Sequence, residues 1–214
     1  MYKRQGKEKV KNKLPNLFEY KMQRYFGYTP LKTNEAVHGV IGIPRVLNMY
    51  ENYPFWFTLF TKLGFSVLLS PASTRKIYEL GIESIPSESE CYPAKLAHGH
   101  VQWLINQGVT HIFYPSIPYE RKEFADANNH YNCPIVTSYP ENIKNNMDPI
   151  VQGEVDFIHP FLSLESEETV AYRMVEELGE KFSIDEKEIR AAVHDAWEEL
   201  AACRNDMRLS LIHI

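Results

Sequence analysis

Two cysteines stand where thiol chemistry is favoured. Cys91 lies near the end of the loop at residues 84–93, just before an expected helix start, where backbone N–H groups and the helix dipole favour a thiolate. Cys133 lies between Asn132 and Pro134. By residue type alone, each cysteine is either a buried, inert thiol or a ligand. Two further loops, residues 115–120 and 139–141, carry polar side chains after apolar segments and complete the candidate site.

Other chemistries find less support. Cys91 and Cys133 lack the CxxC or HxxxH pairing of structural zinc sites. His98 and His100 are two positions apart in an expected helix, so they point to different faces, and we expect ordinary surface or half-buried side chains. Cys203 is interpreted as structural. GxGxxG, P-loop and GxSxG motifs are absent from the sequence, so nucleotide binding and acyl-serine chemistry have no local support.

Strands and helices alternate in the segment that must position these residues. Pro54 is expected to open a helix with Asn52 as cap, Gly64 to end it, and Pro93 to open another that Gly108 ends. Apolar, β-branched runs predict strands at residues 37–43, 65–70, 110–114, 135–138 and 155–158, and shorter helices at 74–80 and 141–147. This alternation predicts an α/β fold, a three-layer Rossmann-like or flavodoxin-like domain with a mostly parallel sheet. Ligands of such sheets bind outside the carboxyl ends of the strands.

The C-terminal part has a different pattern. Residues 165–178 carry an apolar helix face, and Asp185 with Glu188 forms a capping box for a second helix. Charged helices of this kind pack on a neighbouring module or lead into one. The predicted organisation is a linker and junction with an upstream domain (residues 6–35), an α/β domain (36–162) and a helical segment leading to a missing module (163–208).

The two ends require separate treatment. Residues 1–5 read MYKRQ and residues 209–214 read LSLIHI. They resemble translations of the two strands of the transposon end DNA used to prepare sequencing libraries. The alternative is a basic tail and a frayed apolar end. We expect adapter artefacts at residues 1–5 and 209–214, which makes the rest a fragment of a longer reading frame.

Composition excludes several classes of protein. The net charge of −5 argues against nucleic-acid binding, and no stretch approaches the roughly 20 apolar residues of a membrane helix. Three cysteines far apart do not form a disulfide framework, and the chain opens without a secretory signal. These features predict a cytoplasmic protein with neither nucleic-acid nor membrane partners.

Three segments carry a specific family resemblance: residues 41–56, 85–96 and 132–140. They resemble the domain that follows the tandem ATPase modules in large activases of 2-hydroxyacyl-CoA dehydratases, the DUF2229 region. That domain is itself similar to the dehydratase subunits. The resemblance covers about residues 14–160.

The resemblance implies an iron–sulfur protein of anaerobes. The family's activator uses ATP hydrolysis to inject one electron into a dehydratase, which then removes water from a 2-hydroxyacyl-CoA through a radical. The dehydratase-like subunits hold a 4Fe-4S cluster through cysteines, so the resemblance makes Cys91 the first candidate ligand and Cys133 the second. Ser116 occupies a loop where a third ligand would fit geometrically. The neighbouring cofactor-binding candidates are Glu88, Tyr92 and Lys95.

The implied partners are upstream ATPase modules, which would carry the ATP, a downstream dehydratase-like module and a 2-hydroxyacyl-CoA dehydratase. Two features depart from the family pattern. Only two cysteines lie in the matching region, and Cys133 precedes a predicted strand, which would place it at the sheet edge opposite Cys91. On the resemblance, the first hypothesis is a fragment of a 2-hydroxyacyl-CoA dehydratase activase that serves iron–sulfur electron transfer. The alternatives are a non-catalytic docking domain and a metal-free acyl-CoA-binding domain.

Overall fold

A computed structural model describes residues 16–212, with side chains for residues 16–208. The expected adapter residues 1–5 and 213–214 lie outside the described residues, and 209–212 are described only as the backbone end of a helix. Within the described part, no helix is long and apolar enough to cross a bilayer.

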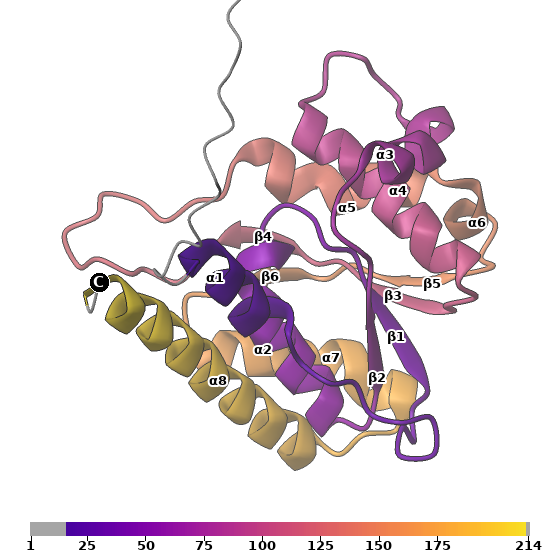
Figure 1. Cartoon of the computed structure of the whole chain (residues 1–214). Coiled ribbons are helices and arrows are strands. Elements are labelled where there is room, and N and C mark those ends of the chain that lie inside the picture. Colours follow the sequence, from indigo (N-terminus) through magenta and orange to yellow (C-terminus); the bar gives the residue numbers. More distant parts are fainter. Residues whose placement is uncertain (1–15, 213–214) are drawn as a thin grey trace, which may run out of the picture.

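The centre of the molecule is a four-stranded parallel sheet in the order β2-β1-β3-β5 (Figure 1). Its strands are β1 (Val40–Ile43), β2 (Ser66–Leu69), β3 (His111–Phe113) and β5 (Asp156–Ile158). The chain leaves the central strand β1 for β2 on one side and then crosses to β3 on the other. The predicted α/β fold with a mostly parallel, Rossmann-like or flavodoxin-like sheet is confirmed.

A second, two-stranded parallel sheet continues beyond the first. β4 (Ser116–Tyr119) pairs with β6 (Phe161–Ser163), and each follows a strand of the main sheet after a short turn. The sequence did not predict these strands because Pro115 and Pro160 stand directly before them and Pro118 lies within β4. The loop expected at residues 115–120 is therefore largely a strand.

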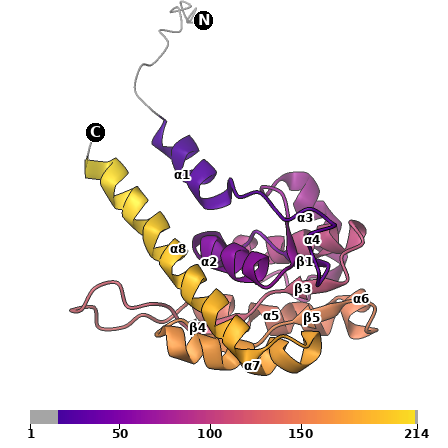
Figure 2. The same ribbon diagram turned by 90° about the horizontal axis from the view of Figure 1, so that it is seen from below.

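Helices cover both faces of the main sheet (Figures 1 and 2). One face carries α2 (Met49–Lys62), α7 (Glu167–Phe182) and α8 (Glu186–Ile212). The other carries α3 (Arg75–Gly81), the 3₁₀ turn η1 (Ile82–Ser84), α4 (Tyr92–Asn106), α5 (Pro134–Asn146) and α6 (Asp148–Val151). α1 (Leu17–Phe26) packs against α2 and α8.

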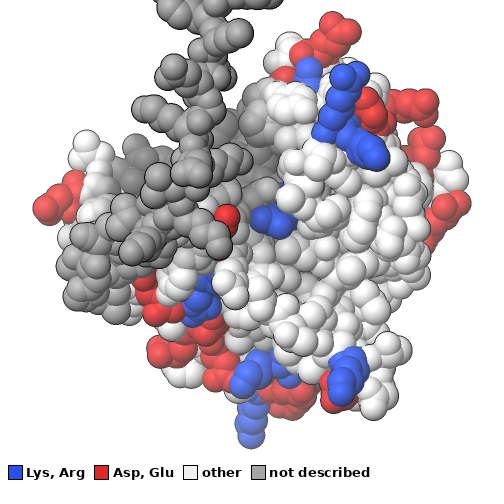
Figure 3. Space-filling model, viewed as in Figure 1, with Lys and Arg blue, Asp and Glu red and all other residues white. Residues whose placement is uncertain are grey.

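Surface charge does not single out a site on the face drawn in Figure 3. Among the described residues visible there, Lys and Arg stand beside Asp and Glu over α3 and α4 and near the ends of α2 and α8. The middle of this face is largely uncharged, apart from a small basic patch and an acidic spot to one side of it. A binding site therefore has to be recognised from its side-chain chemistry.

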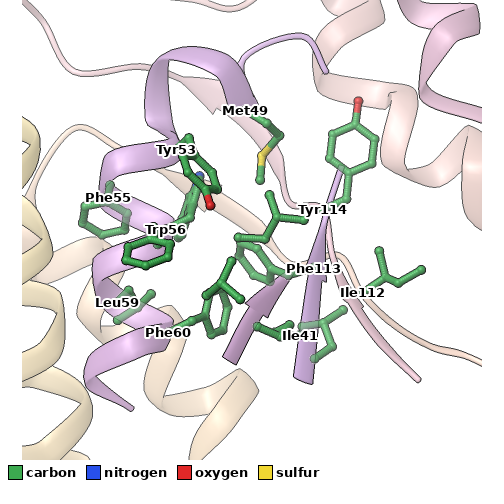
Figure 4. Packing of buried hydrophobic residues seen from close by; sticks show 14 of the residues in the cluster. Ile41, Met49, Tyr53, Phe55, Trp56, Leu59, Phe60, Ile112, Phe113 and Tyr114 are labelled. Carbon is green, nitrogen blue, oxygen red and sulfur yellow. The ribbon is translucent and has the colours of Figure 1, made fainter. Parts of the chain in front are cut away.

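Aromatic rings of α2 form the middle of the core (Figure 4). Trp56 and Phe60 both pack on Phe113 of β3, with ring centroids 4.8 Å apart in each pair. Fully burying such a side chain contributes roughly 1.5–3 kcal/mol. The apolar faces of α7 and α8 join this same core, so these helices cover the domain's own sheet.

α2 begins earlier than predicted. Its first residue is Met49 and its N-cap is Asn48, so Pro54 lies inside the helix and Asn52 is not a cap. Pro54 has no N–H to offer the carbonyl of Tyr50, one turn back. The buried aromatic face holds the helix together despite that lost hydrogen bond.

The predicted strand at residues 135–138 is wrong. Pro134 opens α5, which runs without interruption to Asn146 and includes Pro140, so the helix expected from residue 141 is the second half of α5. The β-branched run Ile135-Val136-Thr137 gave the local signal of a strand, but Pro134 fixes the backbone for a first helical turn. Cys133 consequently starts a helix and does not precede a strand.

Candidate functional site

Cys91 and Cys133 occupy equivalent positions. Cys91 is the N-cap of α4 and Cys133 is the N-cap of α5, two helices that pack together on the same face of the sheet. Both thiols are exposed and neither side chain forms a capping hydrogen bond. The objection that Cys133 lies at the opposite edge is therefore removed. Two thiols at helix N-termini are available for other partners.

Glu90 ties the start of α4 to the middle of α5. Its carboxylate accepts hydrogen bonds from the Tyr139 hydroxyl (2.6 Å) and the Asn142 amide (2.8 Å), both on α5. Burial, together with the adjacent Glu90 carboxylate, raises the pKa of Tyr139 above its ordinary value, so the phenol stays protonated as the donor. The residue that precedes Cys91 is thus anchored on the helix that Cys133 begins.

Glu120 anchors the turn that leads into Cys133. Its carboxylate accepts from the amides of Asn132 (2.7 Å) and Asn52 (3.2 Å to each oxygen) and, at 3.4 Å, from Asn48. The Asn132 amide also donates to the carbonyl of Ile117 at 2.9 Å. Charge-assisted hydrogen bonds of this kind connect the Cys133 turn to β4 and to the start of α2.

The cofactor-binding candidates divide into two groups. Near Cys91, Lys95 donates through Nζ to the backbone carbonyl of Glu88 (2.6 Å), and the exposed ring of Tyr92 lies 5.2 Å from that of Tyr78. These residues shape the loop at residues 84–93. Ser116 is different, because it is fully buried at the start of β4 and its hydroxyl has no hydrogen-bond partner among the described residues.

The described residues do not complete a metal site. Across residues 16–208, no group of three or more His, Cys, Asp or Glu side chains is arranged to hold a metal ion. A 4Fe-4S cluster is held by four thiolates, and Cys91 with Cys133 supply two. The fit is therefore partial: the thiol chemistry suits iron–sulfur ligation, and the number of ligands does not.

His98 and His100 do point in different directions, as predicted, but both are fully buried and not half-exposed. His98 pairs through Nδ1 with the Ser84 hydroxyl (2.8 Å), whereas His100 pairs with Ser70 (2.8 Å) and Ser73 (2.9 Å). Burial lowers the pKa of each imidazole to about 4, so both are neutral at pH 7. Their role is to fix the packing of α4.

Sequence reasoning missed the two carboxylates, Glu90 and Glu120, and the amide of Asn132. Glu90 and Asn132 immediately precede the two cysteines in the chain, which is the one local signal that could have identified them. Nothing in the local sequence around Glu120 indicates that three asparagines meet it.

One comparison with known proteins gives a match. The model of the family described as CoA enzyme activase uncharacterised domain (DUF2229) matches residues 40–211. The match begins at β1 and extends through α8, so it includes both C-terminal helices. No curated protein and no solved structure matches the chain.

Proposed function

The chain belongs to the DUF2229 family of CoA enzyme activase domains, and from this premise we propose that it serves the ATP-dependent activation of a 2-hydroxyacyl-CoA dehydratase. In this proposal, ATP binds to separate activator modules upstream, and a dehydratase-like module follows downstream. This chain provides the α/β domain between them.

The proposed contribution of the domain is half of an iron–sulfur site. The observation that supports it is the pair of exposed thiols, Cys91 and Cys133, at the starts of two adjacent helices. Thiolates are the ligands that iron–sulfur clusters take. The described residues add no third ligand, so the remaining ligands would have to come from outside them, and no electron-transfer step is assigned to these residues.

The residues around the thiols have definite tasks in this proposal. Cys91 and Cys133 each lie at the positive end of a helix dipole. Glu90 fastens the residue before Cys91 to the middle of α5, and Glu120 fastens the turn before Cys133 to β4 and α2. A rigid pair of thiols requires less reorganisation when a metal centre binds.

Anaerobic reconstitution tests the proposal. The 214-residue chain is incubated with iron, sulfide and a small thiol that can complete the ligand set, and bound iron and visible absorbance are measured. We expect wild type to retain iron, Cys91→Ser and Cys133→Ser each to fall to background, and Cys203→Ser to retain it. A colourless wild-type protein without iron, or iron retained equally in both exposed-cysteine variants, would refute the proposal.

A non-catalytic docking domain is the second candidate. It is favoured by the incomplete ligand set and by exposed apolar side chains beside both cysteines, Tyr92 (55% exposed) next to Cys91 and Tyr131 (63%) near Cys133. Its test is binding of the iron-free chain to the purified activator modules. Tyr131→Ser should weaken that binding, whereas Tyr172→Ser, an equally exposed tyrosine on α7 (56%), should not.

A further inference from the structure

The turn after β1 lies at the switch point of the sheet. From β1 the chain passes through α2 on one face to reach β2, and from β2 it passes through α3 and α4 on the other face to reach β3. Open α/β sheets bind ligands outside the carboxyl ends of the two strands where this reversal occurs. Residues 44–48 form the turn at that point.

Arg45 places a cation in this turn, and no carboxylate of residues 16–208 forms an ion pair with it. Its guanidinium carbon lies 3.7 Å from the ring centroid of Phe26 and 5.2 Å from that of Tyr50. The one side-chain hydrogen bond that the described residues offer it is a long contact from Nη2 to the sulfur of Met22 (3.6 Å), and Nε is buried without a partner. By comparison, Arg24 is paired with two carboxylates.

The cation is held firmly in position. The backbone N–H of Arg45 donates to the Ser70 hydroxyl (2.7 Å), which is buried and also bonded to His100 (2.8 Å). Two residues on, Leu47 has φ +45°, a left-handed conformation that is strained for a branched side chain. Strained turns of this kind persist where the surrounding structure imposes them, and they concentrate at ligand sites.

The local electrostatics favour an anion here. The 14-residue helix α2 begins at this turn, and its N-cap, Asn48, makes no side-chain capping bond. The Asn48 amide N–H donates to Glu120, and its Oδ1 is buried without a partner among the described residues. The positive end of the helix dipole adds to the charge of Arg45, and the Glu120 carboxylate, bonded to Asn48 and Asn52, is a negative charge that lies near this helix start. The acidic residue of the first turn, Glu51, lines a separate hollow with Glu123 and Arg204.

We infer that the turn at residues 44–48 binds the phosphate group of a small phosphorylated ligand, with Arg45 as its cation. A guanidinium presents donors in a planar fork that matches phosphate oxygens, and stacking on an aromatic ring keeps that fork oriented. A partly buried cation without a carboxylate partner among the described residues gains more binding free energy from a phosphate than a solvent-exposed cation does. This inference does not depend on the cysteines or on the proposed function.

The test uses the full 214-residue chain and inorganic phosphate at constant ionic strength. Isothermal titration should give saturable binding to one site. Arg45→Met keeps the apolar stem against Phe26 and removes the charge, so affinity should fall roughly tenfold or more. The matched control is Arg75→Met, which removes an 89% exposed guanidinium paired with Glu79 and should leave affinity unchanged.

Three results would overturn the inference: no saturable binding, equal losses in both variants, or acetate competing as well as phosphate does. Arg45→Lys keeps the charge and loses the fork, and it should show intermediate affinity. Thermal unfolding of each variant shows whether it is folded. If Arg45→Met does not fold, the phosphate affinity of Arg45→Lys decides whether Arg45 binds phosphate.

Discussion

Substitution of Gly99 tests the contact that fixes α4 on its neighbour. Gly99 lies in α4 against the backbone of α3, and a Cβ added there would overlap the carbonyl oxygen of Ile77 and lie 2.7 Å from its carbonyl carbon. Gly81 of α3 faces the same contact, where an added Cβ would lie 2.6 Å from that of His98. Backbone atoms cannot rotate away, so Gly99→Ala must push the two helices apart.

The expected loss of stability follows from three contributions. Alanine is favoured over glycine inside a helix by about 1 kcal/mol, which opposes the loss. Overpacking a tight contact costs about 1–3 kcal/mol, and a backbone clash belongs at the upper end. Moving α3 also disturbs the hydrogen bond of buried His98 to Ser84, worth about 1 kcal/mol. The net expectation is a free energy of unfolding lower by about 3 kcal/mol.

Urea unfolding followed by tryptophan fluorescence measures this change. The matched control is Gly179→Ala in α7, where the nearest atom to an added Cβ is 3.6 Å away, an ordinary contact. That variant should gain about 0.5–1 kcal/mol from helix propensity alone. If Gly99→Ala were as stable as wild type, or shifted in the same direction as Gly179→Ala, the close α3–α4 contact would be refuted.

Three further predictions concern pH, thiols and a helix end. Burial lowers the pKa of His98 and His100 to about 4, so as the pH falls the unfolded chain binds protons before the folded chain does. The stabilisation of the folded state is therefore complete above about pH 6.5 and is lost as the pH falls towards 4, at up to about 1.4 kcal/mol per pH unit for each histidine. In urea titrations from pH 7 to 5, the free energy of unfolding should fall less steeply with pH for His100→Asn than for wild type, and equal slopes would contradict this. Cys203 is fully buried, and burial raises the pKa of its thiol to about 11. A thiol reagent should therefore label two cysteines in the native chain and Cys203 only after unfolding. Labelling of all three thiols in the native state would be inconsistent with the fold. Ser183 caps the end of α7 in a left-handed conformation (φ +56°), which glycine adopts more readily than serine does. Ser183→Gly should therefore raise the free energy of unfolding in urea by about 1 kcal/mol. A decrease would argue against the left-handed conformation.

Local patterns predicted the fold class well. Apolar runs with β-branched residues at 37–43 and 65–70, separated by a helix that Gly64 ends, are sufficient to indicate parallel β–α–β units. Pro93 likewise predicted the start of α4 and placed Cys91 at its N-cap. These features succeed because they depend on backbone preferences of neighbouring residues.

Where local signals conflict with packing, the predictions fail. The run at residues 135–138 has β-branched residues and still forms a helix, because Pro134 starts one and the buried face of α5, with Tyr139 and Ile143, needs the helical spacing. His98 and His100 look polar in sequence, yet Gly99 between them brings α3 so close that both are buried.

The sequence by itself determined the parallel α/β domain and the position of one exposed thiol at a helix start. Tertiary structure alone decided that Cys133 begins a neighbouring helix, and that carboxylates anchor each of the two turns on other elements of the fold. Glu90 meets Asn142 across 52 positions, and Glu120 meets Asn52 across 68. Such contacts, like the stacking of Arg45 on Phe26, depend on how helices pack on the sheet, and residue spacing along the chain carries no direct information about that packing.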